Sequence, residues 1–414
     1  MSRKLADYQT IAAAEILAEV HELGRRLSGL KLLHLNSTKD GGGVAELLSC
    51  LLPLFNDLGL QADWQAIQGP PEFFRVTKAF HNALQGRPTV ITPEMYALYQ
   101  QVNEQNAKRL DLGADVVMIH DPQPMALVGR RPPGSKWIWR CHIDLSHSAP
   151  RVLLNRPERS AWELLVDYAN QYDEAIFSLT DFAQNLLIHQ HIIPPSIDPL
   201  SEKNRELPQE LIADICANLG IPDDRRVILQ VSRFDRFKDP LGVIEAYRLF
   251  KARINHRKRF DTCLVLAGGS ASDDPEGQEV LSEVRARAGA DPEIHIIELP
   301  SGSHQAINAL QRRADIIVQK SLREGFGLVV AEGLWKRKPV VATPAGGIKL
   351  QVLDGLTGFL AGSAEELADR WEYLLTHPQV GERLGENGYR HIKQHFLVPR
   401  ELRDYLRLLA DLVG

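Results

Sequence analysis

Short apolar runs alternate with longer helical patterns along most of this 414-residue sequence, and this alternation constrains the fold more than any other feature. Most of the runs are apolar at every position, so strands formed by them must be covered on both faces, as in parallel sheets flanked by helices. The sequence therefore predicts an α/β fold with doubly wound, Rossmann-like parallel sheets. The expected strands are residues 30–35, 116–119, 137–141, 175–179, 227–231, 262–267, 294–297, 316–319 and 340–343.

One stretch without periodicity divides this pattern. Residues 189–204 contain three prolines and have the composition of a linker. The strand–helix alternation restarts after it, and 414 residues exceed what one hydrophobic core usually organises. We therefore expect two Rossmann-like domains, residues 1–195 and 196–398. The last helical segment, residues 399–414, is a candidate to cross back onto the first domain.

Composition excludes several classes of function. Lys and Arg total 48 against 53 Asp and Glu, a net charge of −5 that offers no basic surface for nucleic acid. The four cysteines form no C-x-x-C pair, which favours free thiols in a reducing compartment. No apolar secretory segment opens the chain, and no window approaches the ~20 apolar residues of a membrane span. The sequence predicts a cytoplasmic protein with no nucleic-acid or membrane partner.

Glycine, histidine and charged residues gather where the expected strands end. In open α/β sheets, ligands bind beyond the carboxyl ends of the strands. The simplest arrangement that uses both domains is two sheets that face each other across a cleft. The segments that follow these strand ends are residues 36–44, 120–124, 142–144, 232–238 and 320–327.

Three consecutive glycines, Gly41, Gly42 and Gly43, follow the first of these strands. They let the backbone approach a ligand closely, and a helix that begins at Val44 would point its free amides at an anion. A plain tight turn explains the glycines equally well. Because Glu46 stands where the third glycine of G-x-G-x-x-G belongs, and no Walker A sequence occurs, nicotinamide and P-loop chemistry are disfavoured.

Two cations and two carboxylates mark the second domain. Arg233 and Lys238 follow one strand and are placed to clamp a diphosphate, although a solvated basic loop has the same composition. Glu324 and Glu332 lie eight residues apart, on either side of a helix that is expected to begin near Gly327. One acid is then placed to hold sugar hydroxyls and the other ribose, with diphosphate at the amides between them.

Residues 324–332, Glu-Gly-Phe-Gly-Leu-Val-Val-Ala-Glu, resemble the E-x7-E signature of the retaining glycosyltransferases built from two Rossmann-like domains, the GT-B fold. Arg233 and Lys238 stand where that family has its diphosphate clamp. Stretches of the first domain, among them residues 120–124 and 139–144, are similar to the trehalose synthase branch. The resemblance covers nearly the whole chain. It implies reversible synthesis of trehalose from a nucleoside-diphosphate-glucose and glucose.

The resemblance also implies what the protein binds and which residues bind it. It does not choose among ADP-, UDP- and GDP-glucose, and it implies no obligatory cofactor, Mg²⁺ at most stimulatory, no metal ligands, and a homodimer as one option. The expected catalytic residues are Glu324, His142, Arg233 and Lys238. The expected donor-binding residues are Gly42, Gly43, Arg233, Lys238, Glu324, Gly325, Phe326, Gly327, Leu328 and Glu332. The expected acceptor-binding residues are Glu46, His81, Asn82 and Asp144.

The mechanism implied by the resemblance differs from that of a retaining glycosidase. A glycosidase needs two carboxyl groups about 5–5.5 Å apart, and the sequence indicates no such pair. Instead, the acceptor hydroxyl attacks from the face that the nucleotide leaves, and the departing phosphate takes its proton. His142 faces the anomeric centre in this scheme.

Plainer interpretations and rival functions remain open. His142 could also be a hydrogen-bonded histidine of the core. His120 and Asp121 could form a capped turn, and the acceptor candidates could be ordinary polar residues of the surface. One rival function is a trehalose phosphorylase. Another is a synthase with a different small acceptor, such as a sugar phosphate or glycerate, for which Arg75 and Lys78 are the candidates. The third is a sugar-nucleotide sensor without catalysis.

Overall fold

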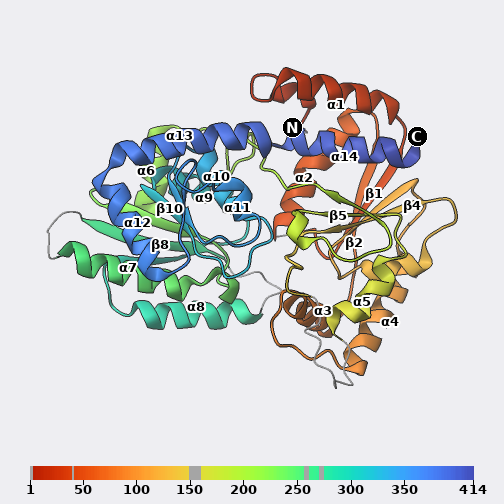
Figure 1. Ribbon diagram of the computed structural model, residues 1–414, viewed down its shortest axis with the longest axis horizontal. Helices are drawn as coiled ribbons and strands as arrows, with labels where there is room; N and C mark the ends of the chain where they lie inside the picture. Colours follow the sequence, from red (N-terminus) through yellow and green to blue (C-terminus); the bar gives the residue numbers. More distant parts are fainter. Residues whose placement is uncertain (1–2, 40–41, 149–159, 256–260, 270–274) are drawn as a thin grey trace. The chain divides into compact units, whose positions relative to one another are not determined.

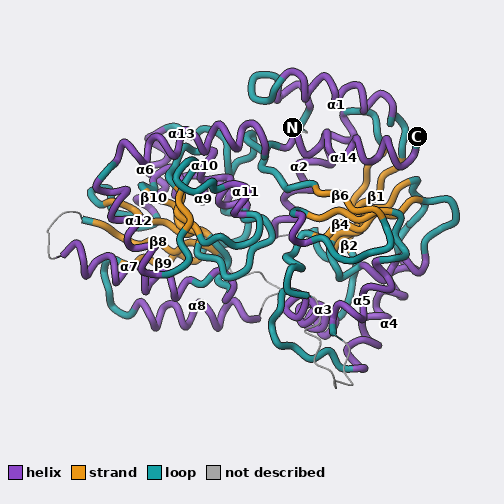
Figure 2. The backbone as a smooth tube through the Cα atoms, viewed as in Figure 1, coloured by secondary structure: helices purple, strands orange, loops and turns teal. Residues whose placement is uncertain are grey.

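The computed structural model describes residues 3–39, 42–148, 160–255, 261–269 and 275–414. The chain divides into two compact units. Unit 1 comprises Met1–Pro195 together with Val398–Gly414, and unit 2 comprises Ser196–Leu397. Each unit is a parallel sheet with helices on both faces (Figures 1 and 2). These sheets confirm the predicted α/β class with two doubly wound domains.

Unit 1 contains a six-stranded sheet in the order β2-β1-β3-β4-β5-β6, in which every neighbouring pair is parallel. Its central strands are buried along nearly their whole length, since most of their side chains are apolar. The strands are β1 (Lys31–Asn36), β2 (Gln61–Ala66), β3 (Val116–His120), β4 (Lys136–Cys141), β5 (Glu174–Phe177) and β6 (His189–Ile192).

The last helix of the chain belongs to unit 1, where it lies beside the first helix (Figure 1). Arg407 forms two hydrogen bonds to Glu19 at 2.5 and 2.9 Å, and Arg400 donates to the carbonyl oxygens of Pro194 and Pro195. Both chain ends are thus built into one core. The helices of unit 1 are η1 (Leu5–Tyr8), α1 (Ala14–Arg26), α2 (Gly42–Asp57), α3 (Pro71–Leu84), α4 (Pro93–Arg109), η2 (Met125–Arg130), α5 (Ala161–Ala169), η3 (Thr180–Phe182) and α14 (Val398–Val413).

Unit 2 contains a second six-stranded parallel sheet, in the order β12-β11-β10-β7-β8-β9. Its strands are β7 (Arg226–Val231), β8 (Thr262–Gly268), β9 (Ile294–Glu298), β10 (Ile316–Gln319), β11 (Val340–Ala342) and β12 (Phe359–Leu360). Its helices are α6 (Gln209–Asn218), η4 (Arg236–Lys238), α7 (Pro240–Asn255), α8 (Pro275–Ala288), α9 (His304–Arg313), α10 (Leu328–Trp335), α11 (Ile348–Gln351), α12 (Ala364–Thr376) and α13 (Pro378–His395).

The core of unit 2 lies between its sheet and the helices that cover it. Tyr247 of α7 and Trp371 of α12 are fully buried against Leu264 of β8 in one apolar cluster. At Gly268, the last residue of β8, an added Cβ would lie 1.7 Å from the carbonyl oxygen of Ser232, so only glycine fits. This close approach fixes the spacing of the two chain segments that leave β7 and β8.

The predicted strands are all present, and the structure adds three: β2, β6 and β12. The expectation that residues 189–204 are a linker is wrong for residues 189–192, which form β6 and pair in register with β5. Both β2 and β6 are edge strands with polar side chains, and an edge strand does not need to be apolar on both faces. The apolar-run criterion therefore missed them.

Parallel pairing places all the carboxyl ends of a sheet at the same edge. In unit 1 the residues after β1, β3 and β4 share that edge, and in unit 2 so do the residues after β7 and β10. Among the described residues, the longest apolar stretches fall short of what a helix needs to span a membrane.

Candidate active site

The centre of the candidate donor site is a contact between Lys238 and Glu324 in unit 2. Lys238 ends η4, which follows β7, and Glu324 lies between β10 and α10. Since β7 and β10 are neighbours, the loops that follow them meet. Lys238 Nζ donates to Glu324 Oε2 at 2.5 Å, and Ser321 Oγ donates to the same oxygen at 3.0 Å. The structure thus brings together two residues that the sequence separates by 86 positions.

This ion pair is partly shielded from water, since the side chains of Lys238 and Glu324 are 18% and 9% exposed. Charge-assisted hydrogen bonds in such surroundings are stronger than neutral ones. The second carboxylate oxygen of Glu324, Oε1, makes no hydrogen bond to any residue that the structure describes. Glu324 therefore keeps one oxygen for a ligand while its charge is already balanced.

The loops that carry this pair are tied to the sheet by a side chain from inside it. Gln230 of β7 accepts a hydrogen bond from the backbone N–H of Lys320 at 3.1 Å and donates to the carbonyl oxygen of Lys238 at 3.0 Å. Thr343, just after β11, donates to the carbonyl oxygen of Ser321 at 2.6 Å. These hydrogen bonds from Gln230 and Thr343 fix the positions of the loops that carry Lys238 and Glu324.

Glycines allow the chain to turn tightly between Glu324 and α10. Gly327 caps the helix in the left-handed region with φ of +85°, and an added Cβ there would lie 3.3 Å from Glu324 Cγ. At Gly347 an added Cβ would lie 2.6 Å from the Cα of Phe326. Leu328 begins α10, so the free amides of its first turn follow directly on Glu324, Gly325 and Phe326.

Arg233 differs from the neighbouring cations in how loosely it is paired. Its side chain is about half exposed, and its nearest acid, Asp235, lies 3.9 Å away. Arg236 is tied to Glu279 and Glu283, and Lys320 is paired with Asp239. Arg233 is therefore free to turn toward an anionic ligand, whereas Arg236 and Lys320 are committed to their carboxylates.

Glu332, the second acid of the E-x7-E segment, lies in the interior of unit 2. It is fully buried on α10, Oε2 accepts a hydrogen bond from Gln311 at 2.9 Å, and Lys203 Nζ lies 3.4 Å from Oε1. The same interior holds the amine of Lys336, whose pKa burial lowers to about 7. Glu332 is thus already paired inside unit 2, and its role toward ribose stays a prediction.

Three histidines form a chain at the carboxyl edge of unit 1. His34 Nδ1 lies 2.9 Å from His120 Nε2, and His120 Nδ1 lies 2.9 Å from His142 Nε2. Burial lowers the pKa of His34 to about 3 and the pKa values of His120 and His142 well below the usual value. The charge of Arg140 lowers the pKa of His142 further. All three rings are therefore neutral at neutral pH.

The hydrogen bonds of this chain restrict its tautomers. Each contact needs one N–H and one lone pair, so the three rings must point their protons in the same direction. His34 Nε2 is buried without a hydrogen-bond partner in the described structure. Unpaired buried donors are rarer in proteins than unpaired acceptors, so we assign the proton of His34 to Nδ1. His142 Nε2 then accepts from His120, and His142 carries its proton on Nδ1.

Asp121, the residue that follows β3, holds the backbone of His142 in place. It adopts φ of +63°, a strained conformation that Asp tolerates better than most residues, and Oδ1 accepts a hydrogen bond from the backbone N–H of His142 at 2.7 Å. Burial raises the pKa of Asp121 to about 6. The hydrogen bond to His142 spans 21 positions, so it is not the local cap of a turn, and it orients a candidate catalytic residue.

The expected acceptor-binding residues occupy separate places in unit 1. Asp144 is buried, and its Oδ1 accepts from the backbone N–H and the hydroxyl of Ser146 at 2.9 and 2.5 Å. His81 and Asn82 are partly buried on α3, and Asn82 Oδ1 has no hydrogen-bond partner among the described residues. Glu46 is partly buried on α2. Their role in binding the acceptor stays a prediction.

The expected glycine cradle of unit 1 lies at the start of α2. The helix begins at Gly42, two residues before the expected Val44, and Gly42 adopts φ of +79°. Gly42 and Gly43 are exposed, and Gly41 lies outside the described residues. The role of Gly42 and Gly43 toward the donor stays a prediction.

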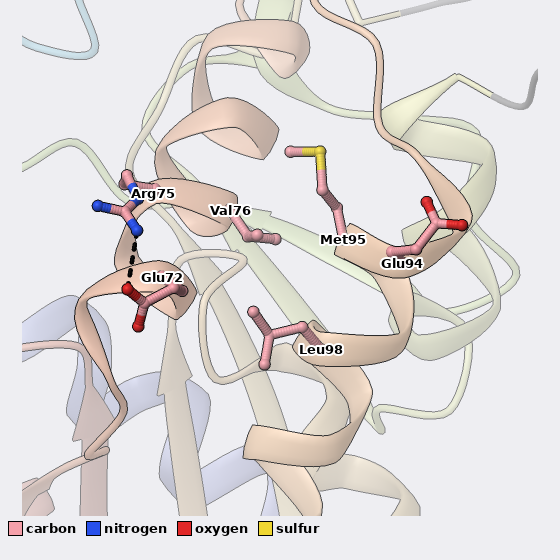
Figure 3. Close-up of a pocket in the computed structure, with 6 residues that line it drawn as sticks. All are labelled: Glu72, Arg75, Val76, Glu94, Met95 and Leu98. Carbon is pink, nitrogen blue, oxygen red and sulfur yellow. Dashed lines mark hydrogen bonds and ion pairs between the residues drawn. The ribbon is translucent and has the colours of Figure 1, made fainter.

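A surface pocket of about 340 Å³ lies between α3 and α4, and Arg75, named above for a rival acceptor, is the one predicted residue among those that line it. Arg75 in its wall forms a 2.8 Å ion pair with Glu72 (Figure 3). Glu94 gives the lining two acids against one cation, which does not favour a phosphorylated acceptor. The other lining residues are Val76, Met95 and Leu98.

Sequence reasoning missed His34, Arg140 and Ser321 as parts of these clusters. The signal for His34 was a single histidine inside the apolar run 30–35, which is uncommon in a buried strand. Arg140 is fully buried and donates to the carbonyl oxygen of Ile193 at 2.7 Å, a role that only the fold reveals.

Two Rossmann-like sheets, polar clusters at their carboxyl edges and an E-x7-E segment define a glycosyltransferase of the GT-B class. Residues 34–184 match the family of the trehalose synthase N-terminal domain, and residues 212–391 match glycosyl transferases group 1. The chain is 42% identical to trehalose synthase of Pyrococcus horikoshii over 417 residues, which cover 100% of this chain and 97% of that protein. It belongs to the trehalose synthase family.

Two further similarities are more distant. Trehalose phosphorylase of Grifola frondosa is 28% identical over 400 residues, 88% of this chain and 54% of that protein. The crystal structure of an α,α-trehalose 6-phosphate synthase from Burkholderia multivorans gives a TM-score of 0.71 at 15% identity, over 94% of this chain and 100% of that chain. At this identity the likeness shows the fold alone.

Proposed function

We propose that this protein is a retaining hexosyltransferase that forms trehalose from a nucleoside-diphosphate-glucose and free glucose, and that the reaction is reversible. The observation that carries the proposal is the contact between Lys238 and Glu324 at the carboxyl edge of unit 2. It joins a cation suited to diphosphate and a carboxylate suited to sugar hydroxyls at one point. Similarity to a trehalose synthase along the whole chain supports the choice of product.

In this proposal the donor is held by unit 2. Lys238 and the half-exposed Arg233 neutralise the diphosphate, and Oε1 of Glu324 accepts hydrogen bonds from the transferred glucose. The first amides of α10, with Gly325, Phe326, Gly327 and Leu328, supply further donors.

The chemical step exchanges one glycosidic bond for another. The bond from the anomeric carbon to the leaving phosphate oxygen breaks, and a bond to the acceptor oxygen forms on the same face. The acceptor hydroxyl gives its proton to the departing phosphate. The protein contributes position and charge, because Lys238 and Arg233 stabilise the negative charge that develops on the diphosphate.

The acceptor is assigned to unit 1. His142 is neutral and offers an N–H at Nδ1, so it is suited to hydrogen-bond a sugar oxygen and not to neutralise charge. We assign Glu46, His81, Asn82 and Asp144 to the acceptor hydroxyls. None of these assignments requires a metal ion, so we expect turnover without added Mg²⁺ and at most stimulation by it.

A trehalose phosphorylase is the second candidate, and the similarity to the Grifola frondosa protein favours it over other rivals. Such an enzyme would use inorganic phosphate where the synthase uses a nucleotide. The Lys238–Glu324 pair suits either leaving group, since both are anionic.

A product assay separates the two functions. The protein is incubated with glucose and ADP-, UDP- or GDP-glucose, and separately with trehalose and phosphate. The proposal expects α,α-trehalose with a nucleotide sugar, identified by its anomeric proton couplings. Glucose 1-phosphate formed from trehalose and phosphate, without transfer from any nucleotide sugar, would establish the phosphorylase instead. Nucleotide binding without turnover in either assay would establish the sensor.

A further inference from the structure

A cluster of two histidines and a glutamate lies at the edge of the unit 1 sheet. Glu174 is the first residue of β5, and its Cα pairs with that of His189, the first residue of β6. His191 follows two positions later, so its side chain points to the same face of the strand as that of His189. Strand pairing alone thus brings three metal-ligating side chains to one place.

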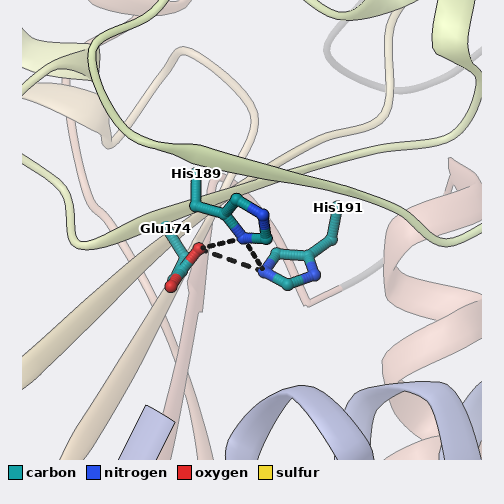
Figure 4. Close-up of side chains that lie close together, drawn as sticks. All are labelled: Glu174, His189 and His191. Atoms are coloured by element: carbon teal, nitrogen blue, oxygen red, sulfur yellow. Dashed lines mark hydrogen bonds and ion pairs between the residues drawn. The ribbon is translucent and has the colours of Figure 1, made fainter. Parts of the chain in front are cut away.

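The ligand atoms of this cluster converge on one point (Figure 4). Glu174 Oε2 lies 3.3 Å from His189 Nδ1 and 3.0 Å from His191 Nε2, and the two nitrogens lie 3.1 Å apart. Three ligands of a tetrahedral Zn²⁺ ion, each 2.0–2.1 Å from the metal, are separated by about 3.3 Å. The triangle in the structure has nearly these dimensions.

Neutral imidazoles can hydrogen-bond within this triangle, but each arrangement leaves one unfavourable contact. Each neutral imidazole has one N–H, and the carboxylate has none. Suppose that His191 Nε2 carries a proton and donates it to Glu174 Oε2 and to His189 Nδ1. Then the lone pair of His189 Nδ1 faces the lone pairs of Glu174 Oε2, and the two repel each other. If both nitrogens carry protons, both donate to Glu174 Oε2, and their hydrogens crowd each other because the nitrogens lie 3.1 Å apart. A cation at the centre satisfies all three atoms at once.

The chemistry of the ligands indicates the class of metal. Two imidazole nitrogens and one carboxylate oxygen suit Zn²⁺ and neighbouring first-row ions, whereas Mg²⁺ prefers oxygen ligands alone. His189 is exposed, so water can complete the coordination.

The cluster is separate from the candidate active site. Glu174 and His189 begin their strands, whereas His120 and His142 lie at the carboxyl ends of the sheet. The β6 strand is also the edge strand, paired on one side only. An ion held by both strands would fasten the edge strand to its neighbour.

We infer that Glu174, His189 and His191 form a binding site for one Zn²⁺ ion or a similar first-row divalent cation that clamps β6 to β5. This differs from the expectation that the chain has no metal ligands. The assignment of residues 189–204 to a linker gave no reason to place His189 and His191 on one face.

The test is calorimetric titration of the full chain, prepared without a polyhistidine tag and freed of metal by a chelator, with ZnCl₂. We expect one equivalent to bind and to raise the melting temperature. Co²⁺ should give the intense visible absorption of a tetrahedral site. The variants H189A, H191A and the double variant should lose this equivalent, the absorption and the thermal shift. The H21A variant, which removes an exposed histidine from α1, should keep all three.

Two results would overturn the inference. One is the absence of Zn²⁺ binding to the original chain at micromolar concentrations. The other is retention of the same equivalent by the double variant, which would place the ion elsewhere. Circular dichroism of each variant without metal checks its folding, and substitution of the exposed His189 should not perturb it. Because the readouts are binding and absorption, they are independent of the glycosyl transfer proposed above.

Discussion

Lys238 Nζ and Glu324 Oε2 lie 2.5 Å apart, in two loops that leave neighbouring strands of the unit 2 sheet. The pair couples the two functions assigned to the donor site, because the cation that faces the diphosphate also balances the carboxylate that faces the sugar. A change at either residue should therefore affect the other.

Replacing Lys238 by alanine should lower kcat by about 100- to 1,000-fold, since it removes charge stabilisation that grows in the transition state. The KM for the acceptor should change much less. Steady-state kinetics with varied donor and acceptor measure both effects. The matched control is Lys393→Ala on α13, which removes an exposed lysine from the same unit and should leave kcat unchanged. A raised acceptor KM with unaltered kcat would contradict the assignment.

The stability effects of Lys238→Met and Glu324→Gln should not add. Each single variant leaves a mostly buried charge without its partner and should lower the free energy of unfolding by about 3 kcal/mol. The double variant should lose less than the sum, with a coupling of about 0.5–3 kcal/mol. Urea unfolding measures the cycle. The exposed pair Arg75–Glu72 is the control, and its coupling should stay below about 1 kcal/mol. Additive effects at Lys238 and Glu324 would show that the contact is absent in solution.

Gly327→Ala should destabilise unit 2 by about 1–2 kcal/mol, because its φ of +85° is unfavourable for any residue with a Cβ. The added carbon would also press on Glu324 and Ile348. We expect a lower melting temperature together with weaker binding of the donor, measured by calorimetry with a nucleotide sugar. Gly129→Ala, where the φ is not positive and an added Cβ meets no atom within 4 Å, should be nearly neutral. Equal melting temperatures for the two variants would be the contrary result.

Acid should destabilise unit 1 through its buried histidines. The pKa of His34 is lowered to about 3, so the unfolded chain takes up this proton first as the pH falls below 6.5. The stability is thus complete above pH 6.5 and decreases toward pH 3, by at most about 1.4 kcal/mol per pH unit for this residue. Asp121 acts in the opposite sense, because its raised pKa of about 6 favours the folded state between pH 6 and 3.8.

The variant His34→Gln tests this account, since glutamine retains a hydrogen-bonding group but does not titrate. Urea midpoints measured from pH 8 to pH 5 should fall less steeply for His34→Gln than for the original chain. His21→Gln, on the surface of the same unit, serves as the control. Identical pH profiles for the original chain and His34→Gln would contradict the proposed burial of a neutral imidazole.

The sequence predicts the α/β class and the internal strands because a strand covered on both faces is mostly apolar, as at residues 116–119 of β3. It does not predict the edge strand His189–Ile192, whose polar residues satisfy no burial requirement. The segment with Glu324 could be found from its spacing alone. The burial of Glu332 could not, because its enclosure depends on Gln311 and Lys203, which lie on other parts of unit 2.

The histidine chain of His34, His120 and His142 was likewise predictable from the sequence only in part. His142 could be singled out, since it follows an apolar strand. Its connection to His34 could not, because the order of β1, β3 and β4 in the sheet is set by packing that no local pattern records.

The return of α14 to unit 1 has a consequence for biosynthesis. Tyr405 and Leu406 of that helix are fully buried in unit 1, yet they are translated only after all of unit 2. Unit 2 is fully synthesised earlier, so it is free to fold during translation while unit 1 still lacks part of its interior. A chain cut before Val398 would therefore lack interior side chains of unit 1, whose other residues are translated first.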